Sequence, residues 1–156
     1  MILNSGTIEA PYAGVYVRPG TSMVMNGGSI GGTDNPVYGI VILGTGSSLE
    51  IKGGHITATG IAISGNGTSG YGNTTIKIDS GVITSTSGTA IYNPQDGELT
   101  INGGTITGYN GIEMKAGNLK VTGGTILGTG TYADVNPNDN GSVNTGDAIL
   151  LNGRNA

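Results

Sequence analysis

Two carboxylates near the middle of the chain have the residue type and spacing for acid–base chemistry. Glu50 and Asp79 stand in two similar eight-residue stretches, LEIKGGHI and IKIDSGVI. If these stretches stack as neighbouring strands, the carboxyl groups lie about 8 Å apart, a separation found in inverting glycosidases. Each carboxylate also has a lysine neighbour, Lys52 or Lys77, which would keep both ionised and leave no general acid. We interpret the four residues as ion pairs and expect no catalytic residue and no enzyme activity.

The single histidine, His55, is the other side chain suited to catalysis or metal binding. It stands at the seventh position of its stretch, where similar stretches have Thr, Ser or Val and where the side chain should face solvent. The stretch has no second histidine, no cysteine and no adjacent carboxylate to complete a metal site or a triad. We therefore expect a solvated surface residue, no metal ion and no cofactor.

An asparagine-rich stretch near the end of the chain has the spacing of an EF-hand calcium loop. It contains Asn136, Asn138, Asn140 and Asp147, with the apolar Val143 in the eighth position. Asn replaces the leading Asp, Asp replaces the closing Glu, and neither flank is helical in pattern. We favour an asparagine-rich surface insertion, and Ca²⁺ binding between Asn136 and Asp147 stays open.

Three tyrosines have corresponding places in the chain. Tyr12, Tyr38 and Tyr109 each precede a short apolar motif by one or two residues, so we expect them at one corner of the fold. Exposed rings there could stack on sugars and form a glycan-contact surface. The alternative, which we favour, is that they cover the edge of the core at a turn, because two intervening repeats lack the tyrosine.

The elements that carry these residues are copies of one repeat. Six octads align, with an apolar residue at positions 1 and 3, Gly at position 6 and Ile at position 8. They begin at residues 1, 23, 49, 76, 99 and 119 and read MILNSGTI, MVMNGGSI, LEIKGGHI, IKIDSGVI, LTINGGTI and LKVTGGTI. Such self-similarity is the signature of a repeat architecture.

The repeat predicts a solenoid built from parallel strands. Apolar alternation at positions 1 and 3 has the period of a strand with one buried face. The glycine at position 6 predicts a bend with positive φ, after which the Ile turns inward. A second motif follows each octad, so that one coil is two extended segments joined by turns: GVYV, GIVI, GIAI, TAIY, GIEM and DAIL.

We predict an all-β fold, a right-handed single-stranded parallel β-helix of about six coils that forms one domain over residues 1–156. Coil length varies while the octad does not, which fits poorly with left-handed helices of fixed coil length, and parallel crossovers favour the right hand. Equivalent inward positions should form continuous aliphatic ladders. Two of these are Ile8, Ile30, Ile56, Ile83, Ile106, Ile126 and Leu3, Met25, Ile51, Ile78, Ile101, Val121.

Composition agrees with a narrow aliphatic core and excludes two classes of partner. All the aromatic residues are Tyr, 4% of the chain, whereas 35% is hydrophobic. The net charge of −4 leaves no basic surface for nucleic acid. No apolar run approaches the roughly 20 residues of a membrane-spanning helix.

The octads resemble the β-helix repeats of the pectate-lyase-like superfamily, and more closely LxIxGGxI-type repeats of secreted or surface-anchored bacterial proteins. The resemblance implies an extracellular or cell-surface bacterial location and a structural or adhesive solenoid segment that contacts glycans or another cell-surface ligand. The alternative is a fragment of a polysaccharide lyase or glycoside hydrolase whose catalytic coils lie outside this chain. Pectinase-type enzymes cluster Asp, or Asp with Lys and Arg, on one outer sheet, but here Arg18 and Arg154 stand in the first and last coils.

Met1 occupies position 1 of an octad, and the last residues follow the second motif of the sixth coil. Open solenoid ends expose strand edges and core cross-section. We expect Met1 and Leu3 at one end, and Ile126 and Leu150 at the other, to favour end-to-end self-association.

Overall fold

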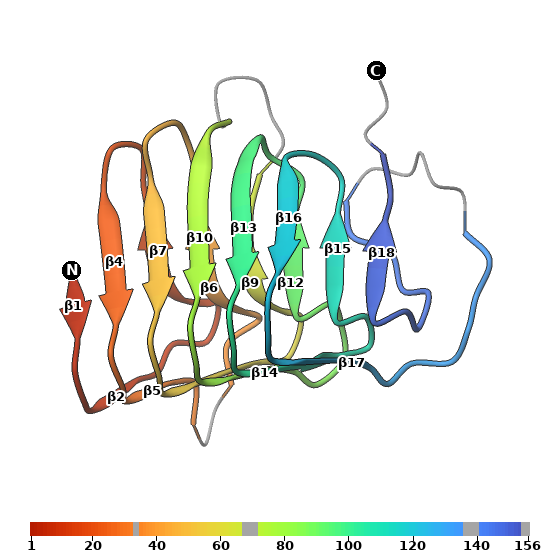
Figure 1. The fold of residues 1–156 in the computed structure, drawn as a ribbon. Helices are drawn as coiled ribbons and strands as arrows, with labels where there is room; N and C mark the ends of the chain where they lie inside the picture. The colour runs from red at the N-terminus through yellow and green to blue at the C-terminus, as the bar shows by residue number, and fades with distance from the viewer. Residues whose placement is uncertain (33–34, 67–71, 136–140, 154–156) are drawn as a thin grey trace.

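The structure is a computed structural model that describes residues 1–32, 35–66, 72–135 and 141–153. These residues form a right-handed parallel β-solenoid, and they contain no helix. Six coils are stacked along one axis, with the N-terminus at one end of the stack and β18 (Ile149–Leu151) near the other (Figure 1). Among the same residues no helix exists that could cross a membrane.

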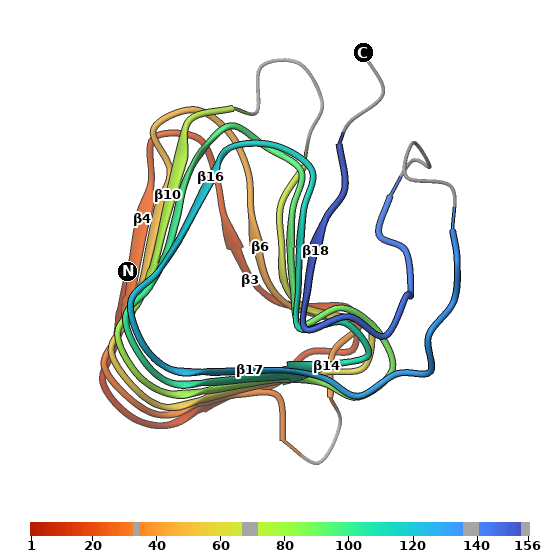
Figure 2. The ribbon, with the colours of Figure 1, turned by 45° about the vertical axis from the view of Figure 1, so that its right-hand side comes forward.

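Each coil contributes one strand to each of three parallel sheets, so the solenoid is roughly triangular in cross-section (Figure 2). Sheet A is formed by β1 (Ile2–Leu3), β4 (Ser22–Met25), β7 (Ser48–Ile51), β10 (Thr74–Ile78), β13 (Gly97–Ile101) and β16 (Asn118–Val121). Sheet B is formed by β2 (Thr7–Ile8), β5 (Ser29–Ile30), β8 (His55–Ala58), β11 (Val82–Ser85), β14 (Thr105–Gly108) and β17 (Thr125–Gly128). Sheet C is formed by β3 (Ala13–Val17), β6 (Tyr38–Ile42), β9 (Ile61–Ser64), β12 (Ile91–Asn93), β15 (Ile112–Met114) and β18.

Each coil therefore has three strands, and the prediction of two extended segments per coil was wrong. The octad does not form a single strand with a terminal bend. Its first residues belong to sheet A and its last two to sheet B, because the chain turns a corner of the triangle within the octad. The second motif forms sheet C.

The corner inside the octad depends on glycine, as the sequence predicted. Position 6 has a positive φ in every coil, between 83° and 104°: Gly6, Gly28, Gly54, Gly81, Gly104 and Gly124. This region of backbone conformation is strained for any residue with a Cβ. The octad therefore preserves its glycine because the corner has the same geometry in each coil.

Both predicted aliphatic ladders are confirmed by the strand register. In sheet B, Ile30, Ile56 and Ile83 are directly paired along the stack, and in sheet A, Ile51 pairs with Ile78. The inner rungs are fully buried, whereas Ile8 and Ile126 in the outermost coils are only partly buried. Stacking is therefore what removes these side chains from water, and no coil could do so alone.

The register of sheet C is less regular than alignment of the second motifs indicates. Aligning GIVI with GIAI pairs Ile40 with Ile61, but the structure pairs Ile40 with Ile63 and Tyr38 with Ile61. Insertions vary the path into sheet C from coil to coil, so the motif does not enter at a constant distance from its octad. The side chains that reach the core, Ile40, Ile63 and Ile91, fix the alignment instead.

Candidate functional site

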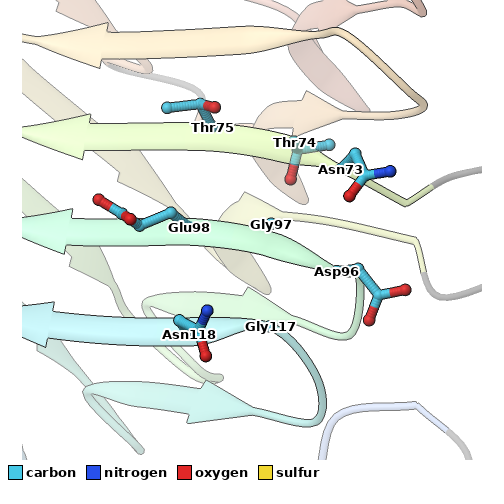
Figure 3. Close-up of a pocket in the computed structure, with 8 residues that line it drawn as sticks. All are labelled: Asn73, Thr74, Thr75, Asp96, Gly97, Glu98, Gly117 and Asn118. Atoms are coloured by element: carbon cyan, nitrogen blue, oxygen red, sulfur yellow. The ribbon is translucent and has the colours of Figure 1, made fainter.

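An open groove runs across the first residues of three strands of sheet A (Figure 3). It has a volume of about 620 Å³ and lies where β10, β13 and β16 begin, at the corner that follows sheet C. Its lining is predominantly polar: Asn73, Thr74, Thr75, Asp96, Gly97, Glu98, Gly117 and Asn118.

Two glycines make the groove hollow. A Cβ on Gly97 would lie 1.9 Å from the Thr74 carbonyl oxygen, and one on Gly117 would lie 2.8 Å from the Gly97 carbonyl oxygen. Both glycines also have positive φ. A residue with a Cβ would be strained at either place. At Gly97 and Gly117 no side chain therefore fills the space between the polar residues that line the groove.

The polar side chains of the groove form a row that crosses three coils. Thr75 pairs with Glu98, and Glu98 pairs with Asn118, in the register of sheet A. All three are exposed. The Thr100 hydroxyl donates a hydrogen bond of 2.7 Å to Glu98 Oε1, which orients the carboxylate. A flat row of hydroxyl, carboxylate and amide groups is suited to hydrogen bonding with the hydroxyls of a sugar chain.

Sequence reasoning missed this groove because most of its residues precede the octad, in the variable part of the coil. A signal was nevertheless present: the residue two places before the octad is Gly97 in the fifth coil and Gly117 in the sixth, but Thr21, Ser47 or Thr74 in the three coils before them. Glycines at the same place in two consecutive coils indicate a hollow beside the strands.

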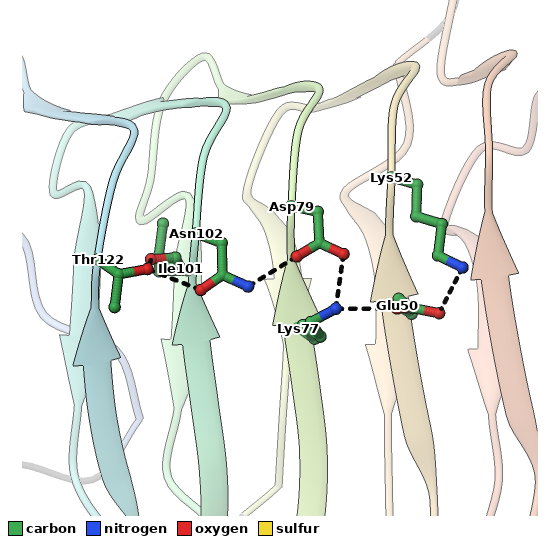
Figure 4. A network of polar contacts seen from close by, with 7 residues as sticks. All are labelled: Glu50, Lys52, Lys77, Asp79, Ile101, Asn102 and Thr122. Atoms are coloured by element: carbon green, nitrogen blue, oxygen red, sulfur yellow. Dashed lines mark hydrogen bonds and ion pairs between the residues drawn. The ribbon is translucent and has the colours of Figure 1, made fainter.

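The predicted ion pairs lie on the outer face of sheet A, beside the octad corner (Figure 4). Lys77 Nζ lies 3.2 Å from Glu50 Oε1 and 2.8 Å from Asp79 Oδ2, and Lys52 Nζ lies 3.1 Å from Glu50 Oε2. Lys52 pairs with Glu50 of its own coil and not with Asp79 of the next coil. Asp79 instead accepts a hydrogen bond of 2.7 Å from Asn102 Nδ2.

Both carboxylates are held in the ionised form. Hydrogen bonds from Lys52, the larger effect, and from Lys77 lower the pKa of Glu50. Hydrogen bonds from Lys77, the larger effect, and from Asn102 lower the pKa of Asp79. The same two carboxylates raise the pKa of Lys77. The pair therefore contains no proton donor for glycosidic bond cleavage, in agreement with the interpretation as ion pairs.

This polar row continues along the stack. The Thr122 hydroxyl donates to Asn102 Oδ1 over 2.7 Å, and near the other end Asn26 Nδ2 donates to Asn4 Oδ1 over 2.7 Å. All these residues stand at position 4 of their octads. Such exposed contacts contribute little each and mainly favour the correct alignment of neighbouring coils.

The three tyrosines do not form one surface. Tyr12 and Tyr38 make an edge-to-face pair with ring centroids 5.4 Å apart, and the Tyr12 side chain is 58% exposed. Tyr109 stands three coils beyond Tyr38, and its hydroxyl donates to the Thr131 carbonyl oxygen. The structure therefore brings together two of the predicted glycan-contact residues and separates the third.

His55 is exposed at the start of β8, as expected for a solvated residue. Within the described ranges no group of His, Cys, Asp and Glu side chains could hold a metal ion. The candidate calcium ligands Asn136, Asn138 and Asn140 lie outside the described residues. The chain just beyond them is bound to sheet C, since the backbone N–H of Val143 donates to Glu113 Oε2 over 3.0 Å.

A covering segment, residues 141–147, crosses the outer face of sheet C (Figure 2). Asn110, which is fully buried, fixes this segment: its Oδ1 accepts hydrogen bonds from the backbone N–H groups of Thr145 and Gly146 over 2.9 and 2.7 Å. Its Nδ2 donates to the Val143 carbonyl oxygen. Buried amides satisfied in this way hold a segment without helix or strand structure of its own.

Three polar residues are buried together beneath that segment. Glu113 is 0% exposed and Asn152 is 2% exposed, and the Lys115 side chain is 4% exposed. Asn152 Nδ2 lies 3.1 Å and Lys115 Nζ lies 4.0 Å from the same oxygen, Glu113 Oε1. The other oxygen, Oε2, accepts hydrogen bonds from Ser142 Oγ and Val143 N.

The architecture places the chain in the class of parallel β-solenoid repeat proteins. No known protein family matches the sequence, and no curated protein and no solved structure matches it. The class therefore rests on the three stacked sheets and their register.

Proposed function

We propose that this chain is a structural or adhesive segment of an extracellular bacterial surface protein, in which a rigid solenoid presents the groove on sheet A to glycans. The observation that carries the proposal is the exposed row of Thr75, Glu98 and Asn118, whose backbone is held in register by three stacked coils. A rigid backbone lowers the entropic cost of binding, because the contacting groups are already in place. The resemblance to secreted bacterial LxIxGGxI and pectate-lyase-like repeats supports the location.

The Tyr12–Tyr38 pair is a second surface that supports sugar contact. Tyr12 exposes an aromatic face beside a ring that holds it in an edge-to-face arrangement. Stacking of such a ring on a pyranose would add to hydrogen bonds made elsewhere. Tyr109 is not part of this surface.

A glycan array followed by calorimetric titration of the best ligand tests the proposal. We expect Asn118→Ala to weaken binding at least tenfold, about 1.4 kcal/mol, because it removes the amide at one end of the row. Asn26→Ala is the matched control: it removes an exposed amide from the same face of sheet A outside the groove. Absence of binding to any glycan, or equal loss in both variants, would contradict glycan contact through the groove.

The alternative function is a fragment of a polysaccharide lyase or glycoside hydrolase whose catalytic coils lie outside this chain. In that case the polar groove, which contains Asp96 and Glu98, would hold part of the polysaccharide. Assays for new reducing ends and for unsaturated products on acidic polysaccharides, made on a longer protein that contains the additional coils, distinguish the two functions. The adhesive proposal predicts no turnover there, whereas turnover would establish the enzyme.

The exposed apolar ends support a proposal of self-association. In the last coil Val121 is 46% and Leu151 is 76% exposed, and Ile2 in the first coil is 67% exposed. Stacking of one end on another would cover these side chains and pair the open strand edges. Sedimentation at increasing concentration should show species larger than the monomer, and a monomer at all concentrations would exclude the association.

A further inference from the structure

We infer that Lys115 and Asn152 form an intramolecular amide bond, with Glu113 as the proton carrier. The inference rests on the buried cluster under the covering segment and is independent of glycan binding. Its starting point is that one carboxylate oxygen, Glu113 Oε1, lies 3.1 Å from the Asn152 amide nitrogen and 4.0 Å from the Lys115 amine.

The backbone places Lys115 and Asn152 next to each other on neighbouring coils. Met114 and Leu151 are paired in the register of β15 and β18, and the N–H of Asn152 donates to the Met114 carbonyl oxygen over 2.8 Å. Lys115 directly follows Met114, and Asn152 directly follows Leu151, so the two residues lie at equivalent places of neighbouring coils. Ile112 and Met114 belong to the core, so alternation places the side chains of Glu113 and Lys115 on the opposite face of the sheet.

The amine of Lys115 and the carboxylate of Glu113 are both buried. Lys115 Nζ and Glu113 Oε1 are separated by 4.0 Å, which is too long for a hydrogen bond, and both side chains are almost fully removed from water. Even paired charges are expensive to bury, because both ions lose their hydration. Transfer of a proton from the ammonium to the carboxylate removes both charges and leaves a nucleophilic amine.

The amide of Asn152 is also incompletely satisfied. Its Oδ1 is buried and has no hydrogen-bond partner within the described part of the chain, whereas Nδ2 donates to Glu113. A half-turn about the Cβ–Cγ bond exchanges the two atoms and places Oδ1 next to Oε1. The protonated carboxyl group can then donate to Oδ1, which polarises the carbonyl for attack at Cγ.

The reaction balances without any co-reactant. Lys115 Nζ attacks Asn152 Cγ to form the Nζ–Cγ bond, the Cγ–Nδ2 bond breaks, and a proton passes from Nζ to Nδ2. Ammonia leaves and takes the proton held by Glu113, which returns to its carboxylate form. The sum is one ammonium side chain plus one carboxamide giving one secondary amide plus one ammonium ion.

Intact-mass spectrometry of the purified chain tests the inference. We expect a mass lower than that of the sequence by about 17 Da, the mass of one ammonia. Trypsin should no longer cleave after Lys115, so that peptides 78–120 and 121–154 appear as one branched species. An unchanged mass together with ordinary cleavage after Lys115 would overturn the inference.

Loss of ammonia has a second source that variants exclude. Asn152 precedes Gly153, and such a pair can lose ammonia by closing a ring on its own backbone. Lys115→Arg keeps the charge but removes the attacking amine, so it should restore the full mass, with circular dichroism to verify folding. If the lower mass persists in Lys115→Arg, the backbone ring is its cause and the inference is wrong.

Two further variants complete the test. Asn152→Asp can form the same amide by losing water, so its cross-linked mass should equal that of the cross-linked wild type. Asn102→Ala replaces an exposed asparagine that also precedes a glycine and should leave the loss of about 17 Da unchanged. If either variant fails to fold, the branched peptide of the wild type still decides the question.

Discussion

Gly54 stacks on Gly28 so closely that a Cβ on Gly54 would lie 2.6 Å from the Gly28 carbonyl oxygen. The octad corner therefore needs glycine for two reasons, a positive φ and the contact with the coil beneath it. Gly6 in the first coil distinguishes the effect of positive φ from the effect of close contact. Its φ is +90°, but nothing lies within 4 Å of a Cβ built there.

We expect Gly6→Val to cost roughly 1 to 3 kcal/mol from backbone strain alone. Gly54→Val and Gly104→Val should cost more, because a neighbouring backbone must also move. Thermal melts of the three variants measure the difference. Equal destabilisation of Gly6→Val and Gly54→Val would mean that the coils are not in the close contact described.

Core truncation on sheet B should be much more costly than a change one residue away. Ile83 and Ile106 are fully buried, so each substitution by Ala should cost roughly 2 to 5 kcal/mol. Val82 is 38% exposed on the other face of the same strand, and Val82→Thr should stay within about 0.5 kcal/mol. Chemical denaturation measures the change in the free energy of unfolding for each variant. A reversed ranking would mean that the assigned strand register is wrong by one residue.

These two predictions concern the part of the fold that could be read from the sequence. Positions 6 and 8 of the octad repeat because the corner and the core have the same geometry in every coil. The split of the octad into two strands was missed, since periodicity does not distinguish a bend from a corner. The Ile40–Ile63 pairing was missed because insertions change the distance from octad to sheet C.

The candidate sites were less accessible to sequence reasoning. The Glu50–Lys77 pair was predicted because it belongs to the octads, but the groove at Glu98 lies partly outside them. The cluster of Glu113, Lys115 and Asn152 depends on a covering segment inserted between β17 and β18. In the sequence, the cluster is indicated only by the charged pair Glu113 and Lys115, two residues apart in and directly after β15. The second motifs of the other coils have no such pair.

The Lys77 network should give a pH dependence whose sign is set by its pKa shifts. The pKa values of Glu50 and Asp79 are lowered on folding, so their stabilising contribution is complete above their ordinary values of 4.5 and 3.8. It is lost as the pH falls through the lowered values. Lys77, whose pKa is raised, contributes below its ordinary value of 10.5 and loses this contribution as the pH rises through the raised value.

Carboxyl NMR titrations of two variants assign this network. Lys77→Gln should raise the pKa of both Glu50 and Asp79, whereas Lys52→Gln should act mainly on Glu50, to which it donates a hydrogen bond. The changes in stability should be small because all four side chains are partly exposed. An Asp79 pKa that responds more to Lys52→Gln than to Lys77→Gln would contradict the assigned contacts.

One tyrosine should titrate unusually late. Burial, followed by the negative charge of Glu113, raises the pKa of Tyr92 from 10.0 to about 12. Glu113→Gln should lower this pKa but leave it above 10.0, because the burial remains. The unfolded chain ionises first, so stability should fall as the pH rises from about 10 to about 12. NMR of the ring-labelled protein measures the titration. A Tyr92 pKa that is unchanged by Glu113→Gln would contradict the electrostatic effect of Glu113 on Tyr92.

The register of stacked coils carries the groove, the ion pairs and the buried cluster, and disulfide trapping tests it most directly. The chain has no cysteine, so introduced pairs report without background. His55 and Val82 are paired in sheet B and are both exposed, and neighbouring strands lie about 4.8 Å apart, within the reach of a disulfide. His55→Cys combined with Val82→Cys should therefore cross-link under mild oxidation, whereas His55→Cys combined with Thr84→Cys should not, because Thr84 pairs with Thr57. Efficient cross-linking of the second pair with none in the first would contradict the register and the account built on it.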